Sequence, residues 1–302
     1  MNTDGRTSNE FFAGGLSDSK KHSRRMRILI TVGIIVFALI VELLRSNLFI
    51  SVDEITFLSN DIPKSFAGVK IVQISDFHNS TSIMDRLLDK VEAQKPDYIF
   101  LTGDIVDQSR TNLDTAMTFV DKLSKIADTY IILGNHDTAL SIEDQKKLSD
   151  SFKKSGAHLL DNDYTYLERG GSRIMLVGTT YSPDDYYSQS LMARLPRDEK
   201  CVIWLHHYPE DFKTILTESE KLGSRADLIF AGHAHGGLIG VPFTEGLYSP
   251  GEGFFPKYTS GRYNDGNSAM IVSRGVGNSG YTLRLFNSLH LVVCELESGK
   301  QK

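Results

Sequence analysis

Cysteine is scarce in this sequence, which contains two, Cys201 and Cys294, among 302 residues. Two cysteines cannot form the dense disulfide framework of a small secreted domain, and they say little about the cellular compartment. Each lies in an apolar run, which predicts two small buried hydrophobic side chains. A disulfide between neighbouring strands stays open at this point, because sequence alone does not show how far apart the two residues lie.

A strong charge of either sign is also missing. The formal net charge is −5, which gives no indication of nucleic-acid binding. Hydrophobic residues make up 40% and charged residues 24%, and these fractions predict a globular protein with a sizeable core. Because neither an internal repeat nor a second domain boundary is visible, we expect one domain over residues 50–297 after an N-terminal extension.

The extension contains a long hydrophobic run. Residues 1–23 are polar, without apolar periodicity, and predict a disordered tail. Residues 26–44 are predominantly apolar, with Glu42 near the end where it can reach the interface. A helix of about 19 residues rises about 28 Å, which is enough to cross the core of a bilayer. We therefore predict a single transmembrane anchor.

The charges around this run predict its orientation. Five basic residues lie at its N-terminal side, namely Lys20, Lys21, Arg24, Arg25 and Arg27. Arg45 alone follows, so the positive-inside rule predicts a cytoplasmic tail and a domain outside the cytoplasm. A buried core helix is disfavoured by the basic cluster. A cleaved signal peptide would have a shorter apolar region, of about 7–15 residues, and a small-x-small cleavage site. Residues 23–25 match a twin-arginine export signal only in their arginine pair.

Short apolar runs predict strands at 70–75, 98–102, 130–133, 202–205 and 228–231, and further strand signals lie at 173–178, 269–273 and 289–295. Between the first and second runs, Ile83, Leu87 and Val91 recur every fourth residue. Between the second and third runs, apolar residues from Leu113 to Leu123 recur three or four apart. Both patterns predict helices. A third helix is expected from Ser141, where Ser-x-x-Asp can form a capping box. Alternating strands and helices predict a layered α/β fold.

Each of the first five runs ends in side chains that can bind metals. The clusters are Asp76/His78, Asp104/Asp107, Asn135–Asp137, His206/His207 and His233/His235. Sites in open α/β sheets lie beyond the carboxyl ends of strands, so we expect the clusters to meet at one edge. In an extended chain, residues two apart point to the same side, so Asp76 and His78 could face one metal, as could His233 and His235. The mixture of carboxylate, amide and imidazole donors favours Mn, Fe or Zn over Mg or Ca.

In their order and spacing, these clusters resemble the signature of the calcineurin-like metallophosphoesterase family. That signature is Asp-x-His, Gly-Asp-x-x-Asp, Gly-Asn-His-Asp/Glu, a lone His and Gly-His-x-His, and all five blocks are present. The resemblance covers residues 50–297 and points in particular to the bacterial membrane-linked subgroup. It implies a four-layer sandwich of two mixed β-sheets flanked by helices. It also implies hydrolysis of a phosphate ester by a hydroxide that bridges two divalent or trivalent metal ions.

The resemblance assigns roles residue by residue. The implied ligands are Asp76, His78 and His235 for one metal, Asn135, His207 and His233 for the other, and Asp104 between both. His136 would protonate or stabilise the leaving oxygen, and Asp107 and Asp137 would orient the ligands or His136. His206 competes with His207, but family members place the ligand two residues before a proline, here Pro209, which favours His207.

The stretch 243–263, rich in glycine, proline and aromatic residues, follows the last motif. It is expected to be a surface loop packed by its own side chains. The alternative is a wall of the substrate cleft, in which Lys257 and Arg262 pair with phosphate. The anchor suggests a substrate at the membrane or cell envelope, such as a lipid-linked phosphate. The competing function is a non-catalytic scaffold of the same fold, but scaffolds usually lack some ligands and this chain retains all of them.

Overall fold

The computed structural model describes residues 8–221, 223, 225–240, 246–250, 252–280 and 283–299. The chain divides into two compact units, residues 1–45 and residues 46–302. Helix α1 (Ser8–Leu48) makes up the described part of the first unit, and its last three residues belong to the second.

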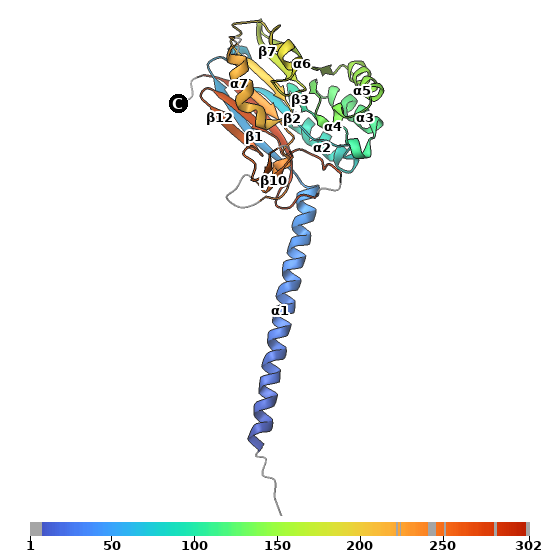
Figure 1. Cartoon of the computed structure of the whole chain (residues 1–302), viewed down its shortest axis with the longest axis vertical. Coiled ribbons are helices and arrows are strands. Elements are labelled where there is room, and N and C mark those ends of the chain that lie inside the picture. The colour runs from blue at the N-terminus through green and yellow to red at the C-terminus, as the bar shows by residue number, and fades with distance from the viewer. Residues whose placement is uncertain are drawn as a thin grey trace, which may run out of the picture. The chain divides into compact units, whose positions relative to one another are not determined.

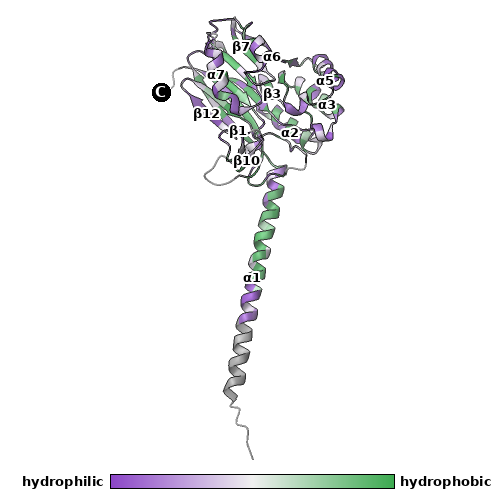
Figure 2. Cartoon of the chain, viewed as in Figure 1, coloured by the Kyte–Doolittle hydropathy of each residue, from purple (hydrophilic) through white to green (hydrophobic). Residues whose placement is uncertain are grey.

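Within α1, Lys21–Leu48 is long and apolar enough to cross a membrane, as judged by length and composition. Figure 2 shows a nearly continuous hydrophobic segment that follows a hydrophilic one. Residues 8–23, which the sequence predicts to be a disordered tail, are part of helix α1, and residues 1–7 lie outside the described part of the chain. Once a helix is nucleated, each added residue gains a hydrogen bond at little further cost, so the helix can continue into the polar sequence.

Two mixed sheets of six strands each form the second unit, as far as its residues are described. The first sheet has the order β1 (Ile50–Ser59), β14 (Leu289–Ser298), β2 (Val69–Ile74), β3 (Tyr98–Thr102), β4 (Asp128–Ile132) and β5 (His158–Leu159). The second has the order β12 (Gly261–Asp265), β13 (Ser268–Val272), β9 (Leu228–Ala231), β8 (Val202–His206), β7 (Ser172–Thr179) and β6 (Asp163–Arg169). Strands β2 to β5 are parallel, as are β13, β9, β8 and β7. A small hairpin pairs β10 (Tyr248–Ser249) with β11 (Gly253–Phe254).

Helices lie on the outer faces of the two sheets (Figure 1). The first sheet carries α2 (Thr81–Gln94), α3 (Leu113–Ser124) and α5 (Ile142–Lys154), and the second carries α6 (Tyr186–Met192) and α7 (Phe212–Lys221). Short helical turns follow the strands at α4 (Asn135–Thr138), η1 (Lys64–Phe66), η2 (Gln108–Arg110), η3 (Pro209–Asp211) and η4 (His235–Gly237). As predicted, the apolar positions of α2 are buried, and the Ser141 side chain accepts from Asp144 N at 3.2 Å to begin α5.

The core therefore has three apolar layers, one between the sheets and one under each set of helices. Phe100 and Phe230 meet edge to face between the sheets, with ring centroids 5.4 Å apart. Cys201 and Cys294 are buried free thiols in the same layer, so they form no disulfide. The predicted four-layer α/β sandwich of two mixed sheets is confirmed.

Candidate metal centre

The five predicted clusters lie at the carboxyl ends of β2, β3, β4, β8 and β9. Hydrogen bonds to backbone atoms connect these ends. Gln73 Nε2 donates to Ala231 O at 2.8 Å, which connects the ends of β2 and β9 across the sheets. Beyond the strands, Asp76 N donates to Gly103 O and Gly232 N donates to His207 O, both at 3.0 Å. The turns that present the predicted ligands are therefore fixed against one another.

These turns are strained. Five predicted ligands have a positive φ, which residues other than glycine rarely adopt: Asp76 (54°), His78 (47°), Asp104 (53°), His233 (63°) and His235 (48°). Such a backbone costs about 1–3 kcal/mol per residue and is concentrated at functional sites. Gly103, at φ 92°, permits a close approach, because a Cβ there would lie 2.6 Å from His207 Nδ1. A Cβ on Gly134 would overlap the Asp104 carboxylate.

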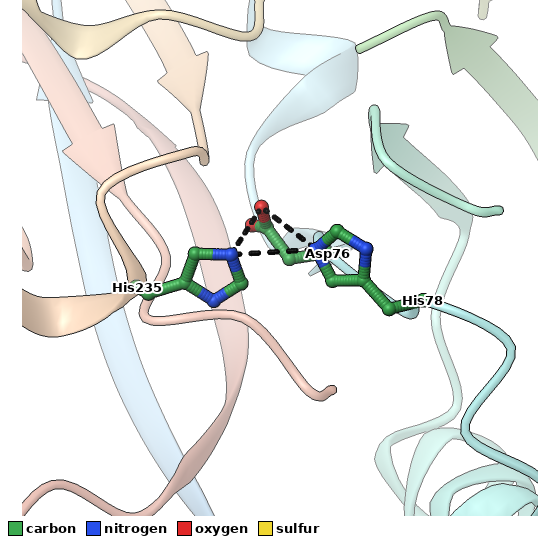
Figure 3. Close-up of side chains that lie close together, drawn as sticks. All are labelled: Asp76, His78 and His235. Carbon is green, nitrogen blue, oxygen red and sulfur yellow. Dashed lines mark hydrogen bonds and ion pairs between the residues drawn. The ribbon is translucent and has the colours of Figure 1, made fainter. Parts of the chain in front are cut away.

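The first group of ligands is Asp76, His78 and His235, whose side chains point toward one another (Figure 3). His78 Nε2 lies 3.3 Å from His235 Nε2. Asp76 Oδ1 lies 3.9 Å from His78 Nε2 and 3.5 Å from His235 Nε2. A single cation between these three atoms would bind two imidazoles and a carboxylate, a common donor set for transition metals.

The second group is Asp104, His207 and His233. Asp104 Oδ2 lies 3.3 Å from His207 Nε2 and 3.7 Å from His78 Nε2, so this carboxylate stands between the two groups. His207 Nδ1 lies 2.7 Å from Thr102 O, to which it donates, and this leaves Nε2 for a metal. The ring of His233 packs against that of His207, with centroids 5.0 Å apart.

Four buried atoms of the predicted ligand set have no hydrogen-bond partner among the described residues: Asp76 Oδ1, His78 Nδ1, Asn135 Oδ1 and His207 Nε2. A buried polar atom without a partner is costly, and native structures keep few of them. All four are atoms of types that bind metal ions. The residues present therefore fit a metal centre, and Asn135, at the start of α4, has a buried side-chain oxygen available as a ligand.

Burial sets the charge of most of these groups. It lowers the pKa of His78 to about 4 and that of His233 to about 3, with His207 adding to the effect at His233. It also lowers the pKa of His235 well below its ordinary value, helped by Arg284. The same burial raises the pKa of Asp76 to about 6. Neutral imidazoles offer the lone pairs that a metal ion requires.

Asp104 and His207 behave differently, because they form an ion pair. Burial alone would raise the pKa of Asp104 and lower that of His207. Their mutual attraction outweighs burial, so the pKa of Asp104 falls far below its usual value and that of His207 rises to about 10. His207 therefore holds a proton as the counter-charge of Asp104. A metal cation would supply the same compensation and displace that proton.

The structure distinguishes His207 from His206. Because adjacent residues of a strand point to opposite faces, the two rings diverge at the end of β8. Both ring nitrogens of His206 are engaged, Nδ1 with Thr179 Oγ1 at 2.9 Å and Nε2 with Asp211 Oδ2 at 3.0 Å. His206 therefore lies outside the ligand cluster, and His207 lies within it.

His136 lies beside the first group, with its ring centroid 4.7 Å from that of His78. Its Nδ1 accepts from Gln108 N at 3.2 Å, so the proton of the neutral ring sits on Nε2. Asp107 Oδ1 lies 3.7 Å from the same Nδ1. Burial opposes the charge of Asp107, but hydrogen bonds from Ser109, Gly280 and Arg110 outweigh it and lower its pKa. Asp107 thus remains a fixed negative charge behind His136.

Asp137 connects two ligand turns. Its carboxylate accepts from Val106 N at 2.9 Å, Gly134 N at 3.0 Å and Ile105 N at 3.3 Å. Burial and the nearby Asp104 raise the pKa of Asp137 to about 7, against the effect of these donors. Its contacts are to backbone, so it positions the Asp104 and Asn135 turns instead of orienting His136.

Arg284 is a residue of the site that sequence reasoning missed. It is fully buried, and its Nη2 lies 3.0 Å from His235 Nδ1 and donates to Gly277 O at 2.8 Å. Its Nε donates to Asn278 Oδ1 at 2.8 Å. It therefore joins Gly277 and Asn278 to a predicted ligand. No local sequence motif indicates that Arg284 belongs to the site. In the sequence it is a single arginine, 49 positions after His235.

The two predicted substrate-binding cations are occupied elsewhere. Arg262 donates to Thr56 O at 2.9 Å and to Asn264 Oδ1 at 2.9 Å. Thr56 of β1 pairs with Glu295 of β14, which in turn pairs with Lys70 at the start of β2. Asp76 follows the other end of β2, so the structure does not bring Arg262 to the cluster. Lys257 Nζ lies over the ring of Tyr258, 4.8 Å from its centroid. Residues 243–245 and 251 of that stretch lie outside the described part of the chain.

Comparison with known proteins agrees with this geometry. The model of the family described as calcineurin-like phosphoesterase matches residues 69–237, which include all seven predicted ligands. The chain is 30% identical to phosphodiesterase YaeI of Escherichia coli (strain K12), over 72% of this chain and 78% of that protein. It is 27% identical to the uncharacterized metallophosphoesterase Cj0846 of Campylobacter jejuni, over 93% and 73%. It is 25% identical to a transmembrane protein with metallophosphoesterase domain of Bos taurus, over 70% and 52%.

Proposed function

Because the chain belongs to the calcineurin-like phosphoesterase family, we propose that it hydrolyses a phosphate ester at a pair of metal ions. The proposed ligands are Asp76, His78 and His235 for one ion, Asn135, His207 and His233 for the other, and Asp104 between them. The observation that carries the proposal is the position of Asp104 Oδ2, 3.7 Å from His78 Nε2 in one group and 3.3 Å from His207 Nε2 in the other.

Two bound ions would polarise the phosphoryl group and make a water molecule a stronger nucleophile. The chain's own residues do the rest. His136 holds a proton at Nε2 for the leaving oxygen, and Gln108 N fixes the ring through Nδ1. Thr102 O orients His207, and Asp137 holds the turn that carries Asp104. A phosphodiester is the first substrate class to test, because one relative is a phosphodiesterase. Phosphomonoesters and pyrophosphates come next.

The test uses the full chain, purified in detergent and supplied with Mn, Fe or Zn. We expect two metal ions per chain and turnover of a chromogenic phosphodiester that a chelator abolishes. His235→Ala should lose both metal and turnover. His206→Gln is the matched control, because His206 is equally buried but lies outside the cluster. A scaffold would bind little metal and turn over nothing, and either result would contradict the proposal.

We also propose that residues 26–44, within the candidate span Lys21–Leu48, anchor the chain in a membrane, with the tail in the cytoplasm and residues 46–302 outside it. The length and composition of this segment and the basic residues at its start support the assignment. Protease added to intact cells should remove the domain. Full protection of the domain, with cleavage only after the cells are opened, would reverse the orientation.

A further inference from the structure

Exposed apolar side chains are concentrated in three segments of the second unit. We call them the apolar rim: Leu48, Phe49, Phe254, Phe255, Leu283 and Phe286. Their exposed fractions range from 45% to 71%. Elsewhere in the described part of this unit, the large exposed hydrophobic residues are Ile142 and tyrosines. Single exposed apolar residues are ordinary, whereas a contiguous patch indicates an interaction surface.

Hydrogen bonds bring the three segments together. Asn47 Nδ2 donates to Arg284 O at 2.8 Å, and Arg284 N donates to Asn47 Oδ1 at 3.1 Å. Leu285 then pairs with Ile239 in a β-bridge. Leu247 N donates to Ile239 O at 3.1 Å, and Phe255 N donates to Leu247 O at 2.9 Å. The three segments of the rim are therefore neighbours in the fold, although they lie far apart in sequence.

Covalent continuity determines what faces this surface. The candidate span ends at Leu48, and Phe49 follows it directly. Asn47 is hydrogen-bonded to Arg284, so the segment at the end of the span is held beside residues of the rim. From Leu44 to Leu48 a helix rises about 6 Å, which is close to the thickness of one headgroup layer. The covalent connection alone therefore keeps Leu48 and Phe49 of the rim within reach of the lipid headgroups.

A cavity of about 630 Å³ extends from the metal centre toward the rim. His78 lies in its wall, and Asn47 and Leu283 line it as well. Arg110, which Asp107 holds at 3.0 Å, contributes a positive charge suited to a phosphate. The cavity thus combines a cation, polar amides and apolar side chains, which suits an amphipathic anion.

We propose that the apolar rim sits in the headgroup region of the bilayer and that the substrate is an amphipathic phosphate ester, which enters the cavity from the lipid surface. The proposal rests on the proposed function, since the metal centre must act on the phosphate. It narrows the substrate class to phosphate esters that partition into membranes.

The first experiment measures the position of the rim in the full chain, reconstituted in vesicles of phosphatidylethanolamine and phosphatidylglycerol. Single cysteines replace Phe254 or Phe286 and carry a fluorophore. Cys201 and Cys294 are 3% and 0% exposed and do not compete for the label. Nitroxide lipids should quench both probes but not the control probe in Ile142→Cys, a residue 87% exposed on α5. Quenching at Phe286 no greater than at Ile142 would overturn the proposal. So would shielding that depends on protein density, which indicates a second copy on the rim.

The second experiment measures turnover of two phosphodiesters, one soluble and one bearing an alkyl chain held in the vesicles. Phe254→Glu with Phe286→Glu should lower turnover of the vesicle-held ester about tenfold or more, since charges disfavour burial in the interface. Turnover of the soluble ester should stay unchanged, as should both activities in Ile142→Glu. Equal loss on both esters would mean a structural defect and contradict the proposal. If the unmodified chain hydrolyses neither ester, the proposed function fails, while the quenching result still decides where the rim lies.

Discussion

Replacing Asp104 by Asn removes the one charge that both groups of ligands share. The two oxygens of the carboxylate make different contacts. Oδ1 accepts from His136 N at 2.8 Å, and Oδ2 faces His207 and His78. An Asn side chain has the same shape and can still accept from His136 N. The substitution therefore removes charge with little change in packing.

The expected loss of metal affinity in Asp104→Asn follows from the distances between Asp104 and the other ligands. A cation held between Asp104 Oδ2 and the imidazole nitrogens, which are 3.3 Å and 3.7 Å from it, lies within about 4 Å of the carboxylate. At that separation the carboxylate's unit charge attracts a divalent cation by about 8 kcal/mol at an effective dielectric constant near 20. Metal affinity should therefore fall about 10⁵- to 10⁶-fold at each ion, since every 1.4 kcal/mol is about tenfold.

The assay is a metal titration followed by turnover of a chromogenic phosphodiester. Asp107→Asn is the control, because Asp107 is equally buried on the same turn but does not face the ligand cluster. That control should retain its metal. Circular dichroism of both variants checks the fold. If Asp104→Asn keeps two ions at unchanged affinity and full turnover, Asp104 is not the shared ligand and the site assignment is refuted.

Four further predictions concern neighbouring residues. His136→Ala should lower turnover about 10²-fold and keep its metal, because the ring supplies a proton without binding the ions; loss of metal in elemental analysis would show that His136 is a ligand. Metal uptake at pH 8 should release a proton from His207, whose pKa is about 10 because Asp104 outweighs burial. Calorimetry in buffers of different ionisation enthalpy measures that proton, and a zero count would contradict the ion pair. By the same sign, the contribution of His207 to the stability of chelated protein should be fully present below about pH 6.5 and be lost as the pH rises toward about 10, measured by urea unfolding. Gly103→Ala should cost about 2–4 kcal/mol in urea unfolding, because it combines a positive φ with contact to His207; an unchanged midpoint would show that the turn adapts.

The strand-end clusters illustrate what sequence patterns can predict. Asp76 and His78, or His233 and His235, follow short apolar runs, and parallel strands bring such ends to one edge whatever the side chains elsewhere. The helices were also predictable from the sequence, because Ile83, Leu87 and Val91 repeat with the period of a helix face. The layered fold and the strand-end clusters therefore follow from local periodicity, whereas the seven predicted ligands are what the resemblance of these motifs to a known family implies.

Tertiary structure decided what depends on contacts between distant segments. Thr179 and Asp211 occupy both nitrogens of His206, whereas His207 lies in the candidate ligand cluster. Arg284 reaches His235, and Arg262 is held away from the site at Thr56, although neither position carries a local pattern. The apolar rim likewise joins three segments through Asn47 and the bridge at Leu285. Such contacts arise only when the chain folds back on itself, because hydrogen bonding and burial are properties of position in space.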